Sequence, residues 1–412
     1  MKKLLISAEQ TFTVVSLMLY SGSPLDALLT NGFTIKETDT TVYRLLFIIT
    51  YIVSLALLTL RWKKATYVLS RDNFILPLIG VCALSSFWSL DSDITIRRVF
   101  GLVGTTIFGI YLASRYTLKD QLKLCLLMFG ISAVMCFLFA LAIPQYAAGA
   151  AGWRGMYPTK NVLGKRFFLS AAICLFLAIT TRENRWISWL IYVTSGVLIL
   201  LSKSTTSLGN FIIITVACFV YYRILPLKYK IMIPILTFIG TLSIAFYIWF
   251  INQVDTILGS VGKDTTLTGR TELWPAVVDM IAKKPWLGYG YGAFWESRST
   301  ESATIIQTVQ WNTPNAHNGF LDLWLGLGLL GLLVFLIGFI INLLRAIYLI
   351  RFDETFVNLW LLIYITFVIF SNLTETTLVD QNSIEWILYV AVVFSSKIST
   401  QKFGKMESLD LV

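Results

Sequence analysis

The side chain best suited to acid–base chemistry in this sequence is His317. It is the one histidine of the 412 residues, and a long apolar stretch begins just after it, at Asn318. The dipole at the start of a helix disfavours a protonated imidazole, so the ring would stay neutral and able to accept a proton. A structural histidine is the competing interpretation. The sequence places no other histidine or cysteine nearby that would complete a metal site.

Cationic side chains in three other segments could hold a phosphate group. Arg154 and Lys160 precede one apolar stretch, Lys203 lies between two others, and Arg270 begins an amphipathic segment. Arginine can bind two phosphate oxygens at once, whereas lysine supplies a point charge. Several such cations would suit a diphosphate. The competing interpretations are solvated loop cations and side chains that extend toward lipid head groups.

The segment that follows Arg270 predicts a helix with one apolar side. Leu273, Val277 and Ile281 recur every four residues, and Pro275 suits a first helical turn. A stripe of this kind is typical of a helix that lies on a membrane surface. Such a helix would aim Arg270 from its first turn.

Two further patterns give weaker indications of ligand binding. Asp91 and Asp93 have the D-x-D spacing that can hold a divalent cation beside a sugar diphosphate, although a turn is favoured here. The glycine-rich stretch 285–292 lacks the Lys-Ser/Thr pair of a phosphate-binding loop. We therefore interpret it as a tight turn with aromatic residues at the membrane interface.

The composition requires lipid around this chain. Hydrophobic residues make up 56% of it and charged residues only 14%, whereas a soluble domain has about 25% charged residues. The net charge of +10 comes from small basic groups between apolar stretches, which indicates cytoplasmic loops rather than a nucleic-acid surface. The five cysteines lie within apolar stretches without metal or disulfide spacing, and we interpret them as packing residues.

The apolar stretches predict an all-α polytopic membrane protein with about twelve transmembrane helices. The first is expected to be a retained helix rather than a cleaved signal peptide. The expected helices lie near 9–28, 43–60, 73–90, 99–114, 121–141, 162–180, 186–201, 207–223, 231–251, 318–344, 355–373 and 383–397.

The distribution of lysine and arginine among the loops predicts the orientation. One set of loops, which includes both termini, has the higher density of these residues and is therefore expected in the cytoplasm. The predicted organisation is transmembrane helices 1–9 in 1–251, a large external loop with an amphipathic helix in 252–317, and transmembrane helices 10–12 with a cytoplasmic tail in 318–412. Arginines on the external side run against the positive-inside rule, and an anionic substrate would explain why they are there.

Together these motifs resemble the O-antigen ligase and polymerase superfamily, which includes the exopolysaccharide-production polymerases. The order of the motifs and their external position fit as well. The matching pieces are Arg154-Gly155, Lys160-Asn161-Val162-Leu163-Gly164, Gly269-Arg270-Thr271-Glu272-Leu273-Trp274, Pro285-Trp286-Leu287-Gly288-Tyr289-Gly290, His317-Asn318-Gly319-Phe320-Leu321 and Leu325-Gly326-Leu327-Gly328.

The resemblance implies a GT-C-like membrane glycosyltransferase without metal or cofactor. Such an enzyme transfers a glycan as a block, with inversion, from polyprenyl (undecaprenyl) diphosphate to an acceptor hydroxyl on the periplasmic face of the bacterial inner membrane. The implied partners are the lipid-linked donor, a glycan or lipid A-core acceptor and the bilayer, and a polysaccharide chain-length regulator is a further candidate. Nucleic acid is not expected.

The resemblance also implies roles for individual residues. His317 would activate the acceptor, with Arg270 and Glu272 as further catalytic residues. Diphosphate contacts would come from Arg154, Lys160, Arg270 and Lys203, and substrate contacts from Asn161, Asn318 and Glu375. Many relatives have arginine at the position of Lys203. Lysine cannot bind two phosphate oxygens at once as arginine does, so phosphate binding is less expected at Lys203.

Three alternatives stay open from the sequence. A ligase would transfer finished polymer to a lipid A-core, whereas a polymerase would extend a chain of repeat units, and no motif encodes the acceptor. A twelve-helix transporter or flippase of lipid-linked oligosaccharide is a different class of protein, whose substrate site is usually near mid-membrane. A non-enzymatic scaffold would not need His317.

Overall fold

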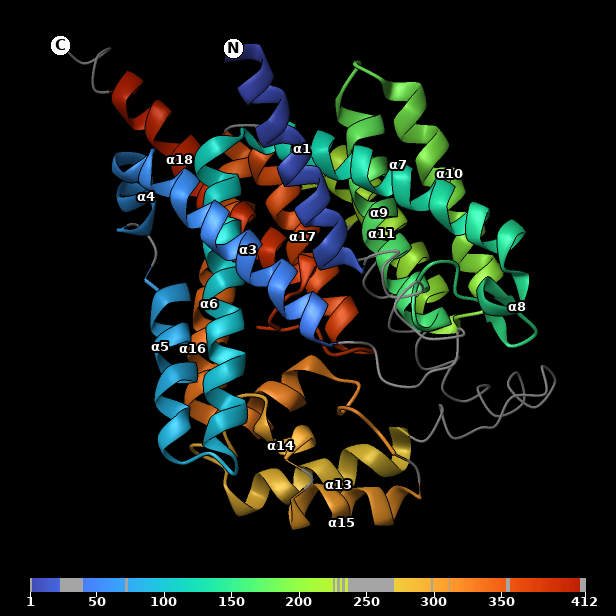
Figure 1. Cartoon of the computed structure of the whole chain (residues 1–412). Coiled ribbons are helices and arrows are strands. Elements are labelled where there is room, and N and C mark those ends of the chain that lie inside the picture. The colour runs from blue at the N-terminus through green and yellow to red at the C-terminus, as the bar shows by residue number, and fades with distance from the viewer. Residues whose placement is uncertain are drawn as a thin grey trace.

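The computed structural model describes residues 2–22, 40–70, 73–224, 270–297, 299–310, 312–352 and 356–407, together with residues 227, 230, 231, 234 and 235. Apart from one short hairpin, the regular elements of the described chain are all helices (Figure 1). The helices are α1 (Lys2–Ser21), α3 (Thr40–Thr59), α4 (Trp62–Leu69), α5 (Ile75–Leu84), η2 (Ser85–Phe87), α6 (Ser92–Arg115), α7 (Leu118–Ala142), α8 (Pro144–Ala147), α9 (Lys160–Thr180), α10 (Arg185–Ser202), α11 (Thr205–Arg223), α13 (Arg270–Lys283), α14 (Ala293–Glu296), α15 (Thr300–Val309), α16 (Gly319–Phe352), α17 (Phe356–Asn372) and α18 (Ile384–Glu407). The hairpin pairs β1 (Ala148–Gly149) with β2 (Gly152–Trp153) in antiparallel register.

Eight helices within the described residues are long and apolar enough to cross a membrane. Three shorter apolar helices are Ile75–Phe87, Phe356–Asn372 and Ile384–Ser396. The predicted spans fall on these helices, except that near 231–251, most of which lies outside the described residues. The prediction of an all-α polytopic membrane protein is confirmed, and the number twelve stays a prediction.

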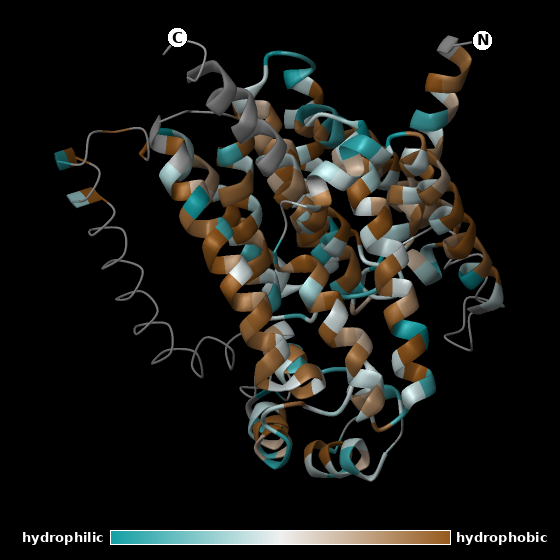
Figure 2. Cartoon of the chain, turned by 90° about the vertical axis from the view of Figure 1, so that its left-hand side faces the viewer, coloured by the Kyte–Doolittle hydropathy of each residue, from teal (hydrophilic) through white to brown (hydrophobic). Residues whose placement is uncertain are grey.

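The long helices run in one bundle, and a smaller group of helices lies at one end of it. α1 begins and α18 ends at the same end, whereas α13, α14 and α15 lie at the opposite end (Figure 1). Apolar residues follow the long helices between these two ends (Figure 2). We call the end with α13–α15 the loop end.

The first helix differs from its predicted bounds because a half-buried charge, Glu9, lies within it. The prediction began it at residue 9, but α1 starts at Lys2 and continues through Glu9. The Glu9 carboxylate pairs with Arg61 at 3.1 Å and with Arg115 at 2.9 Å. Paired in this way, the charge can lie inside the bundle without interrupting the helix.

The amphipathic helix predicted after Arg270 is present as α13, but its apolar stripe packs inside the protein. Leu273, Val277 and Ile281 are buried in a small core with Ile305 and Val309 of α15. The expectation that the stripe lies on a membrane surface was therefore wrong for these side chains. The segment 300–309 supplies a protein partner that the sequence of α13 could not reveal.

A break in α16 fixes the loop end to the bundle. The backbone of Gly328 has φ 66° and ψ −172°, and the glycine-rich stretch lies against this break. The N–H groups of Tyr289 and Gly290 donate to the carbonyls of Leu325 and Gly326 at 3.0 and 2.9 Å, and the N–H of Leu329 donates to Pro285 at 2.8 Å. Non-helical backbone at membrane depth is tolerated where protein satisfies it. The stretch is thus a turn, as predicted.

We expect Gly328→Ala to destabilise the protein by more than about 2 kcal/mol. An added Cβ at Gly328 would lie 2.2 Å from the backbone carbon and oxygen of Trp286, at a φ that L residues disfavour. The matched control is Gly209→Ala in α11, where nothing lies within 4 Å of the new atom. Thermal unfolding in one detergent compares the two variants. Equal melting temperatures would contradict the proposed role of the break.

Candidate active site

His317 occupies the turn that leads into α16. Its backbone is left-handed, with φ 49°, and its N–H donates to Asn315 Oδ1 at 2.9 Å. Asn318 accepts hydrogen bonds from the N–H groups of Phe320 and Leu321 at 3.1 and 3.2 Å, which caps the helix. The predicted position of His317 directly before a helix is therefore correct. Asn318 was predicted to contact substrate, and here its Oδ1 atom caps the helix.

A carboxylate that the sequence analysis missed fixes the peptide just before His317. Both oxygens of Asp322 accept the N–H of Ala316, at 3.1 and 3.0 Å. Asp322 also accepts hydrogen bonds from Trp295 Nε1 at 2.8 Å and from the hydroxyl of Thr376. The available signal was an acidic residue at the start of an apolar stretch, which is costly unless it has partners.

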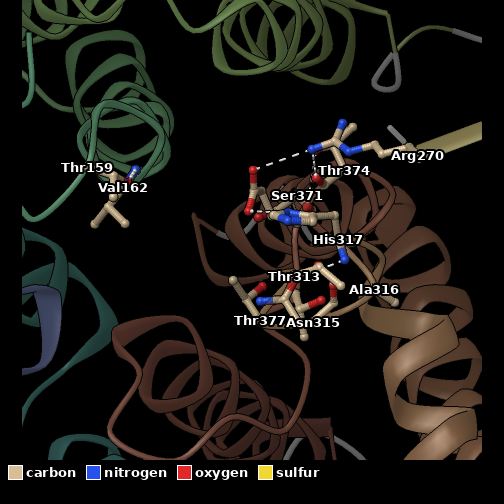
Figure 3. A network of polar contacts seen from close by, with 12 residues as sticks. Thr159, Val162, Arg270, Thr313, Asn315, Ala316, His317, Ser371, Thr374 and Thr377 are labelled. Carbon is tan, nitrogen blue, oxygen red and sulfur yellow. Dashed lines mark hydrogen bonds and ion pairs between the residues drawn. The ribbon is translucent and has the colours of Figure 1, made fainter. Parts of the chain in front are cut away.

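Glu375 joins His317 to Arg270. Its Oε2 lies 3.6 Å from His317 Nδ1, and its Oε1 lies 3.6 Å from Arg270 Nη2. The same Arg270 nitrogen donates to the carbonyl of Thr374 at 2.6 Å. Figure 3 shows the His317 ring and the Arg270 guanidinium approaching the same carboxylate from different elements. We call these three residues the His317 triad.

The backbone holds this carboxylate next to the histidine. Glu375 lies in the loop between α17 and α18, and its carbonyl accepts the N–H of Gly319, the first residue of α16, at 3.1 Å. Its own N–H donates to Ser371 at 2.9 Å. The start of α16 and the end of α17 are therefore tied together at this residue.

The electrostatics favour an ionised Glu375. Burial alone would raise the pKa of this carboxyl, but the hydrogen bond with His317 and the charges of Lys165 and Arg270 hold it below its ordinary value. A carboxylate beside Nδ1 favours the tautomer with the proton on that nitrogen. Nε2 is then the ring nitrogen that can accept a proton from a substrate.

We expect Glu375→Gln to lower stability by about 1–2 kcal/mol at neutral pH, because Gln cannot pair with Arg270. A carboxyl whose pKa is lowered on folding stabilises the protein above its unfolded-state pKa of about 4.3. That contribution is lost as the pH falls through the lower folded-state pKa. The melting temperatures of wild type and variant should therefore differ at pH 7 and converge at acid pH. Asp279→Asn, on the exposed side of α13, is the control, and a pH-independent difference would contradict the explanation.

The other predicted phosphate ligands gather at the β1–β2 hairpin. Arg154 Nε donates to the Tyr146 carbonyl at 2.5 Å, and the guanidinium lies 3.8 Å from the centre of that tyrosine ring. Lys160 Nζ donates to the Ala151 carbonyl at 2.8 Å and Lys203 Nζ to the Ala150 carbonyl at 3.1 Å. These contacts form a second cationic group, the hairpin cations. The start of α9, marked by Thr159 in Figure 3, lies apart from the His317 triad.

The structure brings a different cation toward the triad. Lys165, in the second turn of α9, is near enough for its charge to lower the pKa of Glu375. Its neighbour Arg166 pairs with the buried Glu385 of α18 and donates to the Ser21 carbonyl at 2.6 Å. Arg166 thus links three helices, whereas Lys165 adds positive charge beside the triad.

Two predicted residues lie on exposed surface. Asn161 is exposed in the first turn of α9, and Glu272 is exposed in the first turn of α13. Neither is among the contacts that build the His317 triad. Their roles in substrate binding and catalysis stay predictions.

The D-x-D pair serves a helix start. Asp91 caps α6 by accepting the Ile94 N–H at 3.0 Å, and Asp93 lies in the first turn. Within the described ranges, no group of three or more histidine, cysteine or acidic side chains could hold a metal ion. Asp91 ends the connection that leads into α6, whereas Asp93 lies within the helix.

A cavity of about 440 Å³ is lined by residues close in sequence to the triad, although none of the three triad residues lines it. Asn315, Asp322 and Thr376 line one part of it, and Arg98, Glu296 and Asp380 line another. Its lining thus contains amide, hydroxyl and charged groups, which can bind sugar hydroxyls.

One comparison with known proteins falls on a segment that carries part of this site. Residues 190–336 match the family described as O-Antigen ligase, a stretch that includes Arg270 and His317. The chain is also similar to the Exopolysaccharide production protein ExoQ of Rhizobium meliloti (strain 1021), with 36% identity over 84 residues. That match covers 20% of this chain and 19% of the relative, so the chain aligns with about a fifth of its length.

Proposed function

We propose that this chain is a membrane glycosyltransferase of the O-antigen ligase and polymerase superfamily, which the match of residues 190–336 and the similarity to ExoQ support. It transfers a glycan as a block from polyprenyl diphosphate to an acceptor hydroxyl, with inversion and without a metal. The observation that carries the proposal is the His317 triad, in which one carboxylate holds both a base and an arginine at the loop end.

The proposed reaction needs a base and a group of cations. The acceptor oxygen attacks the anomeric carbon as His317 Nε2 takes its proton, and the bond from that carbon to the diphosphate breaks. The lipid diphosphate leaves with the bonding electrons. Arg270 and Lys165 offset the negative charge that develops on it. Because the lipid diphosphate is an activated leaving group, no nucleotide is required.

The remaining predicted residues keep proposed roles. The hairpin cations now donate hydrogen bonds to backbone carbonyls. They would contact the diphosphate or a charged glycan when its oxygens replace these carbonyls as acceptors. Asn161 and Asn318 would bind sugar hydroxyls. Glu272 would assist proton transfer if substrate binding turns it toward the triad.

The proposed location is the bacterial inner membrane, with both termini in the cytoplasm and the loop end in the periplasm. Lipid-linked donor and glycan or lipid A-core acceptor would meet there, and a polysaccharide chain-length regulator is a candidate partner. The higher density of lysine and arginine in the loops that include both termini supports this orientation. The anionic substrate then explains the positive charge beside the triad.

A flippase is the competing function, and the broken α16 does not favour it. Broken helices in transporters line a substrate site, whereas the break at Gly328 is filled by the backbone of residues 285–290. A flippase would move the lipid-linked glycan without releasing diphosphate lipid.

The acceptor is tested with purified protein in bilayers. We would supply one lipid-linked donor with either a lipid A-core acceptor or a second lipid-linked repeat unit, and measure product length. Single additions to lipid A-core would identify a ligase, and a ladder of lengthening products would identify a polymerase. No product with either acceptor would contradict the proposed function.

A further inference from the structure

A groove between α3 and α6 has the walls expected for a lipid chain. It has a volume of about 820 Å³. Phe47 and Ile48 of α3 and Phe100 of α6 line it, and Ile48 and Phe100 are exposed. On a bundle that crosses a membrane, exposed apolar side chains face hydrocarbon.

Arginines stand at the loop end of this groove. Arg44 lies in the second turn of α3, and Arg97 and Arg98 lie in the second turn of α6. Arg97 Nε donates to the Asp93 carbonyl at 3.1 Å. Arg98 pairs with Glu296, whereas no carboxylate of the described chain pairs with Arg44 or Arg97. Apolar walls that end in arginines are complementary to a lipid with a phosphate head group.

Polar side chains also line the groove, although a binding site for a hydrocarbon chain alone would not need them. Gln381 lies against Gly101, where an added Cβ would be 2.3 Å from its Oε1. The hydroxyl of Tyr51 donates to Asn382 Oδ1, and the Asn382 N–H donates to Thr105 Oγ1 at 2.9 Å. Polar side chains such as these are costly to place against hydrocarbon alone. They therefore favour an occupant with a polar head.

The groove continues toward the His317 triad. Arg98 and Glu296 line both the groove and the 440 Å³ cavity, which reaches Asn315 and Thr376. The loop between α17 and α18 also joins the two places, since it carries Glu375 near one end and Gln381 near the other. The Arg98–Glu296 ion pair thus lies where the groove meets the 440 Å³ cavity.

We propose that the α3–α6 groove binds the lipid anchor of the acceptor, which is then a sugar linked to a lipid phosphate or diphosphate. Its phosphate lies on Arg44 and Arg97, its chain follows Phe47 and Phe100, and its sugar passes Arg98 toward His317. The donor diphosphate occupies the separate site at Arg270. This inference rests on the proposed glycosyltransferase function and adds the class of its second substrate.

The first test measures binding without catalysis. Native mass spectrometry of the full chain in detergent would count bound undecaprenyl diphosphate, with phosphatidylglycerol and undecaprenol as comparison lipids. We expect two bound diphosphate lipids in wild type, one in Arg44→Gln/Arg97→Gln and one in Arg270→Gln. The control Arg182→Gln/Arg223→Gln removes two exposed cations elsewhere and should still bind two.

The second test measures transfer to two acceptors. Each arginine contributes about 1 kcal/mol to binding of an anionic lipid head, so Arg44→Gln/Arg97→Gln should raise KM for a lipid-linked acceptor about thirtyfold. The donor KM, and the rate with a water-soluble acceptor that lacks the lipid phosphate, should not change.

Three outcomes would overturn the proposed groove site. They are unchanged lipid stoichiometry in Arg44→Gln/Arg97→Gln, an equal loss of phosphatidylglycerol, and an equal effect on the soluble acceptor. If wild type transfers no glycan at all, the proposed function fails, while the binding count still reports on the groove.

Discussion

His317→Asn is expected to reduce glycan transfer by about 100- to 10,000-fold while the protein keeps its fold. Asparagine tolerates the left-handed backbone found at His317, where φ is 49°. Its amide can still donate a hydrogen bond to Glu375, but it cannot accept a proton at neutral pH. The loss should therefore appear in kcat, measured as release of polyprenyl diphosphate, with little change in melting temperature.

A second substitution at position 317 separates the loss of the base from the effect of backbone strain on stability. His317→Ala loses the base as well, and it also places a residue with a Cβ and no polar group in the left-handed region, at a cost of about 1–2 kcal/mol. We expect the two variants to be equally inactive, with only His317→Ala less stable. If His317→Asn transfers glycan at the wild-type rate, His317 is structural and the proposed mechanism is wrong.

Arg270→Gln is expected to lower kcat by about 100- to 1,000-fold, because a fixed charge beside the leaving diphosphate is removed. Arg270→Lys keeps a charge but loses the bidentate fork, so its activity should be intermediate. The control is Lys283→Gln, near the other end of the same helix and exposed to solvent. Rates are measured at saturating acceptor with varied donor.

Substituting Glu375, the partner of Arg270, tests the role of Arg270 more sharply. Arg270→Gln leaves the Glu375 carboxylate, now without that partner, in a largely buried place, so stability should fall. The double variant Arg270→Gln/Glu375→Gln removes both charges and should recover part of the stability but none of the activity. Recovery of activity, or wild-type kinetics in Arg270→Gln, would contradict a role for Arg270 at the diphosphate.

Local patterns were sufficient to predict much of this molecule. Apolar stretches of membrane length predicted the long helices, and the stripe at Leu273, Val277 and Ile281 predicted α13. The sequence also placed His317 directly before a helix. Glu375 was predicted as a substrate contact, and the structure puts its carboxylate 3.6 Å from His317 Nδ1.

Features that depend on distant partners were not predictable from local patterns. The break at Gly328 is satisfied by residues 285–290, and the stripe of α13 is buried by α15. Asp322 is explained by hydrogen bonds from α14 and from the loop after α17. In each case the second half of the interaction lies tens of residues away, so its type and spacing give no local signal.

The arrangement of the candidate site also depends on partners that are distant in the sequence. The sequence grouped the three hairpin cations with Arg270 as one diphosphate site. The structure instead holds Lys160 and Lys203 on carbonyls of the β1–β2 turn and Arg154 on the Tyr146 carbonyl of α8. Lys165 was one of several cations near the start of α9, and only the packing of α9 against α17 gives it electrostatic contact with Glu375.

One measurement tests the central proposal most directly. Purified protein in bilayers would receive a polyprenyl-diphosphate donor labelled in the glycan, together with an unlabelled acceptor. We predict that one diphosphate lipid is released for each labelled glycan that reaches the acceptor, and that His317→Asn does neither. Movement of intact labelled lipid across the bilayer without diphosphate release, or equal transfer by the variant, would contradict the account.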